Sequence, residues 1–122
     1  MRILLAMAAI LFGALVSVAH AQNKVGMHLE ECTEWRDFNG SHYTRNVCNR
    51  AVTVFFMTLD GKNRIERHLQ RNEPIDTGIL SVTAKELGWI GATCPVGFRP
   101  DVPFTPENRQ RFFDSDYDCV PG

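Results

Sequence analysis

The chain has 122 residues, 22% of them charged, and a formal net charge of −1 at pH 7. This near-neutral total excludes the strongly basic character of general nucleic-acid binders, so no nucleic-acid partner is expected. The length fits one small domain, and the sequence shows no internal repeat or interdomain linker.

The N-terminal segment has the features of a secretory signal peptide. A positive charge at the second residue precedes an apolar stretch, and Ala-His-Ala at residues 19–21 is a small-residue cleavage site. The alternative is an uncleaved membrane anchor, but the apolar stretch is shorter than the roughly 20 residues that span a bilayer. We therefore predict a signal peptide of residues 1–21 and a single disulfide-stapled domain of residues 22–122. That domain has no predicted membrane span, and its expected location is secreted or periplasmic.

Apolar alternation and β-branched or aromatic runs predict strands over much of the chain. Residues 50–59 carry the strongest signal, because apolar residues occupy both faces, and this predicts a central strand. Asn-Gly at 39–40 and Asp-Gly at 60–61 are typical of hairpin turns, since these residues tolerate positive φ. The expected strands cover residues 27–36, 42–47, 50–59, 63–70, 75–82 and 89–94.

Two short helices are expected in the C-terminal half. Thr83, followed three residues later by Glu86, has the spacing of a capping box, and Gly88 ends this helix within about a turn. Proline at position 106 is typical of a first helical position and predicts a helix that extends to about Phe113. Residues 95–106 contain four prolines and predict a wrapped loop.

The order of these elements predicts a mainly β fold, a small β-sandwich or barrel with one short C-terminal helix packed on it. Residues 63–70 are the ambiguous element. Ile65 and Leu69 are four positions apart, which also fits a short helix, but the preceding Asp-Gly turn favours a strand.

Four cysteines follow the predicted cleavage site and allow three pairings. We predict Cys32–Cys48, because the hairpin turn between them brings the flanking residues together. We also predict Cys94–Cys119, which ties the C-terminal tail to an apolar strand. Export favours disulfides, and loops of this length contribute about 3 kcal/mol per bridge.

No metal site and no cofactor are predicted. The cysteine spacings do not fit a zinc module, and the three histidines after the predicted cleavage site have no ligand-like spacing. Asp114, Asp116 and Asp118 resemble the opening of a calcium loop, but Cys119 stands where the EF-hand pattern requires glycine. We expect these aspartates to form an acidic, solvated tail.

We predict that the protein is not an enzyme. Ser41 and His42 are adjacent, but a Ser-His-Asp site depends on three-dimensional geometry, and the G-x-S-x-G elbow is absent. Disulfide pairing would leave no thiol nucleophile. Turnover that disappears on changing His42 or His68 would contradict this prediction.

Two regions are candidates for binding a partner. Phe98 and Phe104 lie on the Pro-rich loop and would anchor a partner if they are exposed there. The turn at Asn39 and Gly40, with Tyr43 close behind, is the other region. Asn39 also begins an N-x-S glycosylation acceptor, which matters only in a eukaryotic secretory pathway.

The charge is unevenly distributed along the chain. Residues 36–71 contain seven basic and three acidic residues, whereas residues 101–118 contain five acidic and two basic ones. Two solvated faces of opposite sign are the favoured interpretation, and a basic patch for an anionic partner is the alternative.

Three stretches of the sequence resemble small exported bacterial proteins of unknown function. The resemblance covers most of residues 22–122 and rests on cysteines, turns and core strands, so it implies an exported disulfide-stapled domain and no particular activity. The stretches are Asn46-Val47-Cys48-Asn49 before Val52-Thr53-Val54, Cys94-Pro95-Val96-Gly97-Phe98, and Tyr117-Asp118-Cys119-Val120-Pro121.

A second resemblance concerns residues 39–43, which are similar to the S-G-x-x-Y loop of periplasmic lysozyme inhibitors, themselves small exported β proteins. Gly40 and Tyr43 match, whereas Asn39 stands in place of serine. Our leading hypothesis is an exported, non-enzymatic binding or interaction module with a protein partner. The alternative, implied by the second resemblance, is an inhibitor of a secreted hydrolase such as lysozyme.

Overall fold

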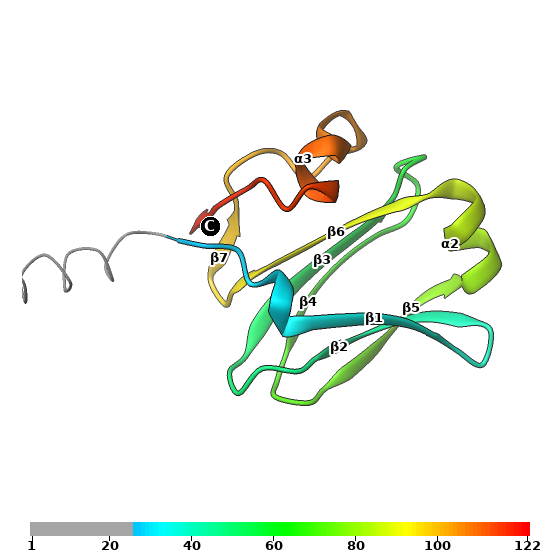
Figure 1. Ribbon diagram of the computed structural model, residues 1–122, viewed down its shortest axis with the longest axis horizontal. Helices are drawn as coiled ribbons and strands as arrows, with labels where there is room; N and C mark the ends of the chain where they lie inside the picture. The colour runs from blue at the N-terminus through cyan, green and yellow to red at the C-terminus, as the bar shows by residue number, and fades with distance from the viewer. Residues whose placement is uncertain (1–25) are drawn as a thin grey trace, which may run out of the picture.

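The computed structural model describes residues 26–122, and the predicted signal peptide of residues 1–21 lies outside this part. Eight strands and two short α-helices follow one another in the order shown in Figure 1. They are β1 (Thr33–Phe38), β2 (Ser41–Asn46), β3 (Val52–Thr58), β4 (Arg64–Leu69), β5 (Pro74–Leu80), α2 (Ser81–Leu87), β6 (Trp89–Pro95), β7 (Phe98–Pro100), α3 (Arg109–Phe113) and β8 (Cys119–Pro121).

The strands form three antiparallel sheets with the orders β1-β2-β5, β4-β3-β6 and β7-β8. In Figure 1, β1, β2 and β5 lie on one side of β3 and β6, and α3 lies on the other. The prediction of a mainly β fold with a short C-terminal helix is confirmed. The strands of residues 26–122 do not close into a barrel.

Strand β3 is the centre of the fold because both of its faces are buried. Val52 and Val54 belong to one apolar cluster together with Leu69 of β4. Phe55 and Met57 point the other way, into a second cluster. Strand β3 pairs with β4 on one side and β6 on the other, so the predicted central strand within residues 50–59 is confirmed.

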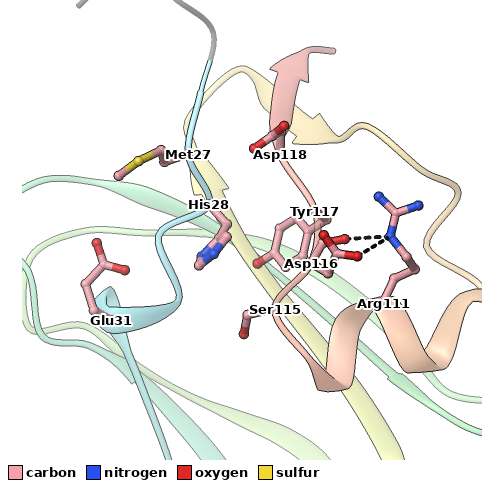
Figure 2. Close-up of a pocket in the computed structure, with 8 residues that line it drawn as sticks. All are labelled: Met27, His28, Glu31, Arg111, Ser115, Asp116, Tyr117 and Asp118. Atoms are coloured by element: carbon pink, nitrogen blue, oxygen red, sulfur yellow. Dashed lines mark hydrogen bonds and ion pairs between the residues drawn. The ribbon is translucent and has the colours of Figure 1, made fainter.

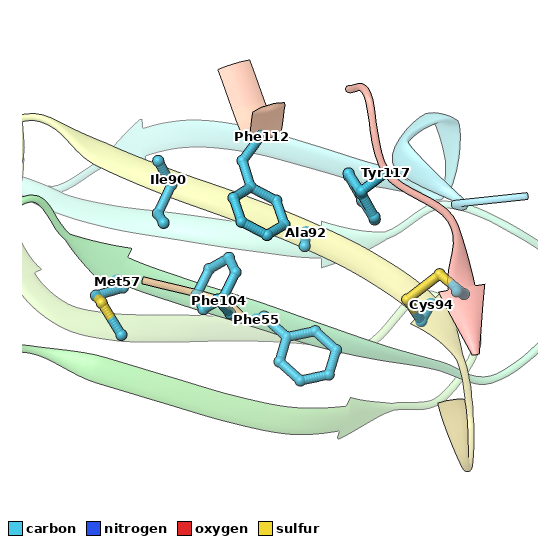
Figure 3. Packing of buried hydrophobic residues seen from close by; sticks show 9 residues of the cluster. Phe55, Met57, Ile90, Ala92, Cys94, Phe104, Phe112 and Tyr117 are labelled. Atoms are coloured by element: carbon cyan, nitrogen blue, oxygen red, sulfur yellow. A yellow bond between two sulfur atoms is a disulfide. The ribbon is translucent and has the colours of Figure 1, made fainter. Parts of the chain in front are cut away.

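The C-terminal segment covers the face of β3 and β6 that is turned away from β1-β2-β5. The ring centroids of Phe104 and Phe112 are 4.9 Å apart, and Phe112 lies 5.2 Å from Tyr117. Figure 3 shows these rings packed beside Phe55 and Ala92. Helix α3 thus packs on a sheet, as predicted for the C-terminal helix.

Both predicted disulfides are present. The β1–β2 hairpin brings Cys32 and Cys48, which lie just outside it, to a Cα separation of 4.9 Å. Cys94 of β6 and Cys119 of β8 have a Cα separation of 5.7 Å. Each bridge contributes to one of the two apolar clusters, so both bonds connect their segments of the chain to the core.

The strand predicted over residues 27–36 is wrong in its first half. Met27 is 76% exposed, and Glu30–Cys32 form a 3₁₀ turn. The Leu29 N–H donates to the carbonyl of Thr93 at 2.8 Å, which draws this part of the chain across β6 rather than beside β2. Regular strand pairing therefore begins only at Thr33.

The predicted capping box at Thr83 is also wrong. Strand β5 ends at Leu80, helix α2 begins at Ser81, and no side chain caps it. Instead, the Ser81 N–H donates to the carbonyl of Gly40 at 2.8 Å, so a contact with the β1–β2 turn sets the start of this helix. The helix ends before Gly88, as predicted, where a φ of 74° favours glycine.

For the remaining elements too, some follow from neighbouring residues in the sequence and others depend on distant ones. Residues 64–69 form strand β4 rather than a helix, which confirms the strand interpretation of segment 63–70. Helix α3 ends at Phe113, as predicted, and follows a 3₁₀ turn that begins with Pro106. Strand β7 lies within the predicted Pro-rich loop and differs from that prediction, because its partner β8 lies outside the loop, at Cys119–Pro121.

None of the helices in the described residues has the length and apolarity needed to cross a membrane.

Candidate functional site

The Asn39-Gly40 turn closes the β1–β2 hairpin, as predicted. Asn39 has a φ of 52° and Gly40 a φ of 80°, the left-handed conformation required by a type I′ turn. A Cβ added at Gly40 would meet nothing within 4 Å, so glycine is favoured here by the backbone conformation and not by space. The turn is exposed, which places the Asn39 glycosylation acceptor at the tip of the hairpin.

Tyr43 lies on the outer face of sheet β1-β2-β5, where it is paired with Arg36 across the hairpin. The ring of Phe38 meets the Tyr43 ring edge to face, with 5.9 Å between the centroids. Phe38 itself is 59% exposed. A depression of about 230 Å³, which we call the outer-face groove, is lined by Arg36, Phe38, Tyr43, Thr44, Arg45 and Pro74.

Three of the five predicted partner-binding residues therefore lie at one end of one hairpin, namely Asn39, Gly40 and Tyr43. Sequence reasoning missed Phe38 and Arg45, which complete the groove. The missed signal was the period-2 alternation of a strand. Once the Asn-Gly turn sets the register, that alternation places both residues on the same face as Tyr43.

Phe98 and Phe104, the other two predicted partner-binding residues, do not lie on that hairpin. Phe104 is only 5% exposed and packs against Phe55 and Phe112, so the exposure on which its candidacy depended is absent. Phe98 is half-buried and packs against the same cluster. The Pro-rich segment folds back on the sheet, and this turns its aromatic residues inward.

Partial burial raises the pKa of the Tyr43 phenol, and the Asp76 carboxylate on the neighbouring strand β5 raises it further. The phenol therefore stays protonated at neutral pH and can donate a hydrogen bond. The nearby guanidinium groups of Arg36 and Arg45 can only donate hydrogen bonds. The outer-face groove thus combines apolar rings with several donors at its rim.

The inner face of the same sheet carries His42, which was considered for catalysis. His42 Nδ1 lies 3.2 Å from a carboxylate oxygen of Asp37, and the imidazole ring packs against the indoles of both Trp35 and Trp89. Within residues 26–122, His42 Nε2 has no hydrogen-bond partner. The Ser81 hydroxyl lies beside the Asp37 carboxyl instead, and it lowers the pKa of that carboxyl together with His42. In this part of the chain, no serine hydroxyl is therefore hydrogen-bonded to the imidazole.

A second depression lies beside the C-terminal tail, and two of the three alternating aspartates, Asp116 and Asp118, line it (Figure 2). The Arg111 Nε donates to the backbone oxygen of Asp116 at 2.6 Å and is 3.3 Å from its carboxylate. Asp114 accepts from Gln110, and Asp118 points away from Asp116 in Figure 2. The described residues contain no group of three or more potential ligands that could hold a metal ion.

Glu30 and Tyr117 form the buried polar contact nearest to this depression. The Tyr117 hydroxyl donates to a carboxylate oxygen of Glu30, and it accepts the Thr93 N–H at 2.8 Å. Burial raises the pKa of Glu30, although the Tyr117 hydrogen bond and the nearby His28 partly oppose this. Burial and the Glu30 charge also raise the pKa of Tyr117, so the phenol stays protonated.

The raised pKa of Glu30 predicts a specific dependence of stability on pH. Between the ordinary value near 4.5 and the raised value, the folded chain binds more protons at Glu30 than the unfolded chain does. The free energy of unfolding should therefore fall as pH rises through this window. Glu30→Gln keeps an acceptor for Tyr117 and should remove this fall. Denaturant melts from pH 4 to 7 test it.

The matched control is Glu31→Gln, which removes the neighbouring exposed carboxylate but leaves Glu30 in place. This variant should retain most of the wild-type slope between pH 4 and 7, because Glu31 is the smallest of the causes that act on the pKa of Glu30. An equal loss of slope in both variants would show that Glu30 is not the residue responsible.

The chain was compared with family models, curated proteins and solved structures, and none of them matches it.

Proposed function

We propose that this protein is an exported, non-enzymatic binding module that engages a protein partner through the outer-face groove. The observation that carries the proposal is the exposed Phe38 ring in edge-to-face contact with the half-buried Tyr43 ring, in a groove that Arg36 and Arg45 also line. Tyrosine and arginine are enriched where protein interfaces are most strongly stabilised, whereas lysine and glutamate are depleted.

The groove is suited to an apolar anchor residue of a partner. Such a side chain would pack between the Phe38 and Tyr43 rings and the ring of Pro74, and burial of that surface stabilises the complex by about 25 cal/mol per Å². Arg36 and Arg45 would donate to backbone carbonyls or carboxylates around the anchor. A protein surface supplies both kinds of group side by side.

The proposed location is secreted or periplasmic. The two disulfides support an oxidising compartment, because such bonds persist outside the reducing cytosol. An exported location also agrees with the resemblance to small exported disulfide proteins.

We further propose that the sheets β1-β2-β5 and β4-β3-β6 are the two layers of a small sandwich.

Capture from the exported fraction of the native organism tests the groove directly. A partner retained by the wild-type protein should be lost with Phe38→Ala and Tyr43→Ala, with at least about a tenfold loss of affinity for each, as expected for central aromatic anchors. Val96→Ala changes an apolar side chain that is 43% exposed but lies in the turn between β6 and β7, and it should bind as wild type does. Capture that is unaffected by Phe38→Ala and Tyr43→Ala would disprove this role of the groove.

The alternative function is inhibition of a secreted hydrolase such as lysozyme. It is favoured by one observation, that the Asn39-Gly40 turn projects from the sheet with Phe38 and Tyr43 directly beneath it. A lysozyme activity assay with added protein separates the two functions. Inhibition at micromolar concentration that is lost in Tyr43→Ala would support the inhibitor, and no inhibition would remove it.

A further inference from the structure

A third depression lies between α3 and the two tryptophans, and we call it the tryptophan pocket. Its volume is about 360 Å³, within the range of sites that hold small ligands. It shares no lining residue with the outer-face groove. The lining residues are Glu30, Trp35, Trp89, Ile90, Gly91, Phe112, Phe113 and Ser115.

The glycine at position 91 allows the two indoles to line one surface. A Cβ added at Gly91 would lie 2.8 Å from Cζ2 of Trp35 and 3.1 Å from Cζ3 of Trp89, so a side chain there would displace both rings. The indole centroids are 4.7 Å apart, and each indole also packs on Phe56 from the other side. The rings are therefore held in place by the core and remain only half-buried.

Among the described residues that line the pocket, Glu30 is the only ionisable one. One of its carboxylate oxygens accepts the Tyr117 hydroxyl. Among residues 26–122, no lysine or arginine forms an ion pair with Glu30. Partial burial of a carboxylate without a neighbouring cation destabilises its charged form, and an opposite charge brought next to it reduces this desolvation penalty.

The surroundings of the pocket favour a cation as well. The depression of Figure 2 shares Ser115 with the tryptophan pocket and is lined by the acidic residues Glu31, Asp116 and Asp118. Its basic residues are His28, which lies near Glu30, and Arg111, which is already held by Asp116. Acidic groups around a cleft raise the local concentration of cations.

We propose that the tryptophan pocket binds the guanidinium group of an arginine side chain presented by a peptide or protein. A guanidinium is planar and weakly hydrated, and it stacks on indole faces while its edge donates to a carboxylate. The tilted, adjacent indoles form an open surface rather than a box, which suits a flat ion better than a spherical ammonium. Glu30 supplies the acceptor at its edge.

Intrinsic fluorescence reports on this pocket because the chain has two tryptophans, Trp35 and Trp89, and both line it. The protein is titrated with N-acetyl-arginine-methylamide, with the neutral isostere N-acetyl-citrulline-methylamide and with the equivalent lysine derivative. The arginine probe should give a saturable change in tryptophan emission. Citrulline and lysine should each bind at least tenfold more weakly.

Two variants show where the probe binds. Glu30→Gln should weaken arginine binding at least tenfold, whereas the matched control Glu86→Gln, which changes an exposed carboxylate on α2, should change it less than twofold. Phe113→Ala alters a ring that is 51% exposed, so it should fold normally and weaken binding several-fold. Circular dichroism of each variant confirms folding.

The proposal is overturned if citrulline binds as tightly as arginine, because charge would then contribute nothing. It is also overturned if Glu30→Gln binds arginine as wild type does, or if lysine matches arginine, since stacking of a planar ion would then be excluded. Loss of partner capture in Phe38→Ala, with arginine binding intact, would show that the outer-face groove and the tryptophan pocket act separately.

Discussion

Reduction of both disulfides should leave the domain marginal or unfolded at physiological temperature. The bridges close loops with sequence separations of 16 and 25 residues. Each reduces the conformational entropy of the unfolded chain and so stabilises the folded state by about 3 kcal/mol. A domain of this size has a total stability of about 5–15 kcal/mol. Thermal melts with and without reductant, combined with titration of free thiols, measure the effect.

The two bridges should not contribute equally. Cys94 and Cys119 are fully buried, and their bond holds β8, a strand of only three residues, against β6. Cys32 and Cys48 join segments that the six paired positions of the β1–β2 hairpin already hold together. The double variant Cys94→Ala/Cys119→Ala should therefore melt at a lower temperature than Cys32→Ala/Cys48→Ala.

A melting temperature that hardly moves while every thiol is shown to be free would contradict this account. The core around β3 would then hold the fold without covalent help. If Cys32→Ala/Cys48→Ala is instead the less stable variant, the hairpin depends on its bridge more than its strand pairing indicates.

Asn46→Ala should destabilise the domain by about 3 kcal/mol or more, the largest effect expected of a single polar substitution here. Asn46 is 0% exposed. Its side-chain amide donates to the carbonyls of Arg50, Leu69 and Gln70 at 2.7, 3.1 and 3.1 Å, and its oxygen accepts the Cys48 N–H at 3.0 Å. Alanine removes all four of these hydrogen bonds, and although the Gln70 carbonyl still accepts the Glu73 N–H, each buried group that is left unpaired is costly.

Asn49→Ala is the matched control, because it changes an exposed asparagine in the same connection between β2 and β3. Its unfolding free energy should lie within about 0.5 kcal/mol of wild type. Asn46→Asp should be nearly as harmful as Asn46→Ala, since a carboxylate cannot donate to the three carbonyls. Denaturant melts of the three variants test this, and a loss below 1 kcal/mol for Asn46→Ala would show that water replaces the side chain.

Several contacts of the candidate sites could not be predicted, because they join residues far apart in the chain. The Tyr117 hydroxyl meets Glu30 across 87 positions, and nothing near either residue indicates that pairing. In the sequence, Asn46 is a single polar residue two positions before Cys48. Nothing there indicates that its amide donates to the carbonyls of Leu69 and Gln70. The same limit applies to Gly91, whose small size matters only because Trp35 lies across it.

The sequence by itself determined the features that depend on neighbouring residues. These are the doubly apolar strand β3, the Asn39-Gly40 turn, the end of α3 at Phe113 and both disulfide pairings, since the pairings follow from a hairpin and an adjacent strand. Only the tertiary structure decided which side chains stay exposed. It buried Phe104 and left Phe38 and Tyr43 on an open face, because burial is set by which sheet or helix packs above a residue. It also started α2 at Ser81 through a contact with Gly40, where a distant carbonyl replaces the missing local cap.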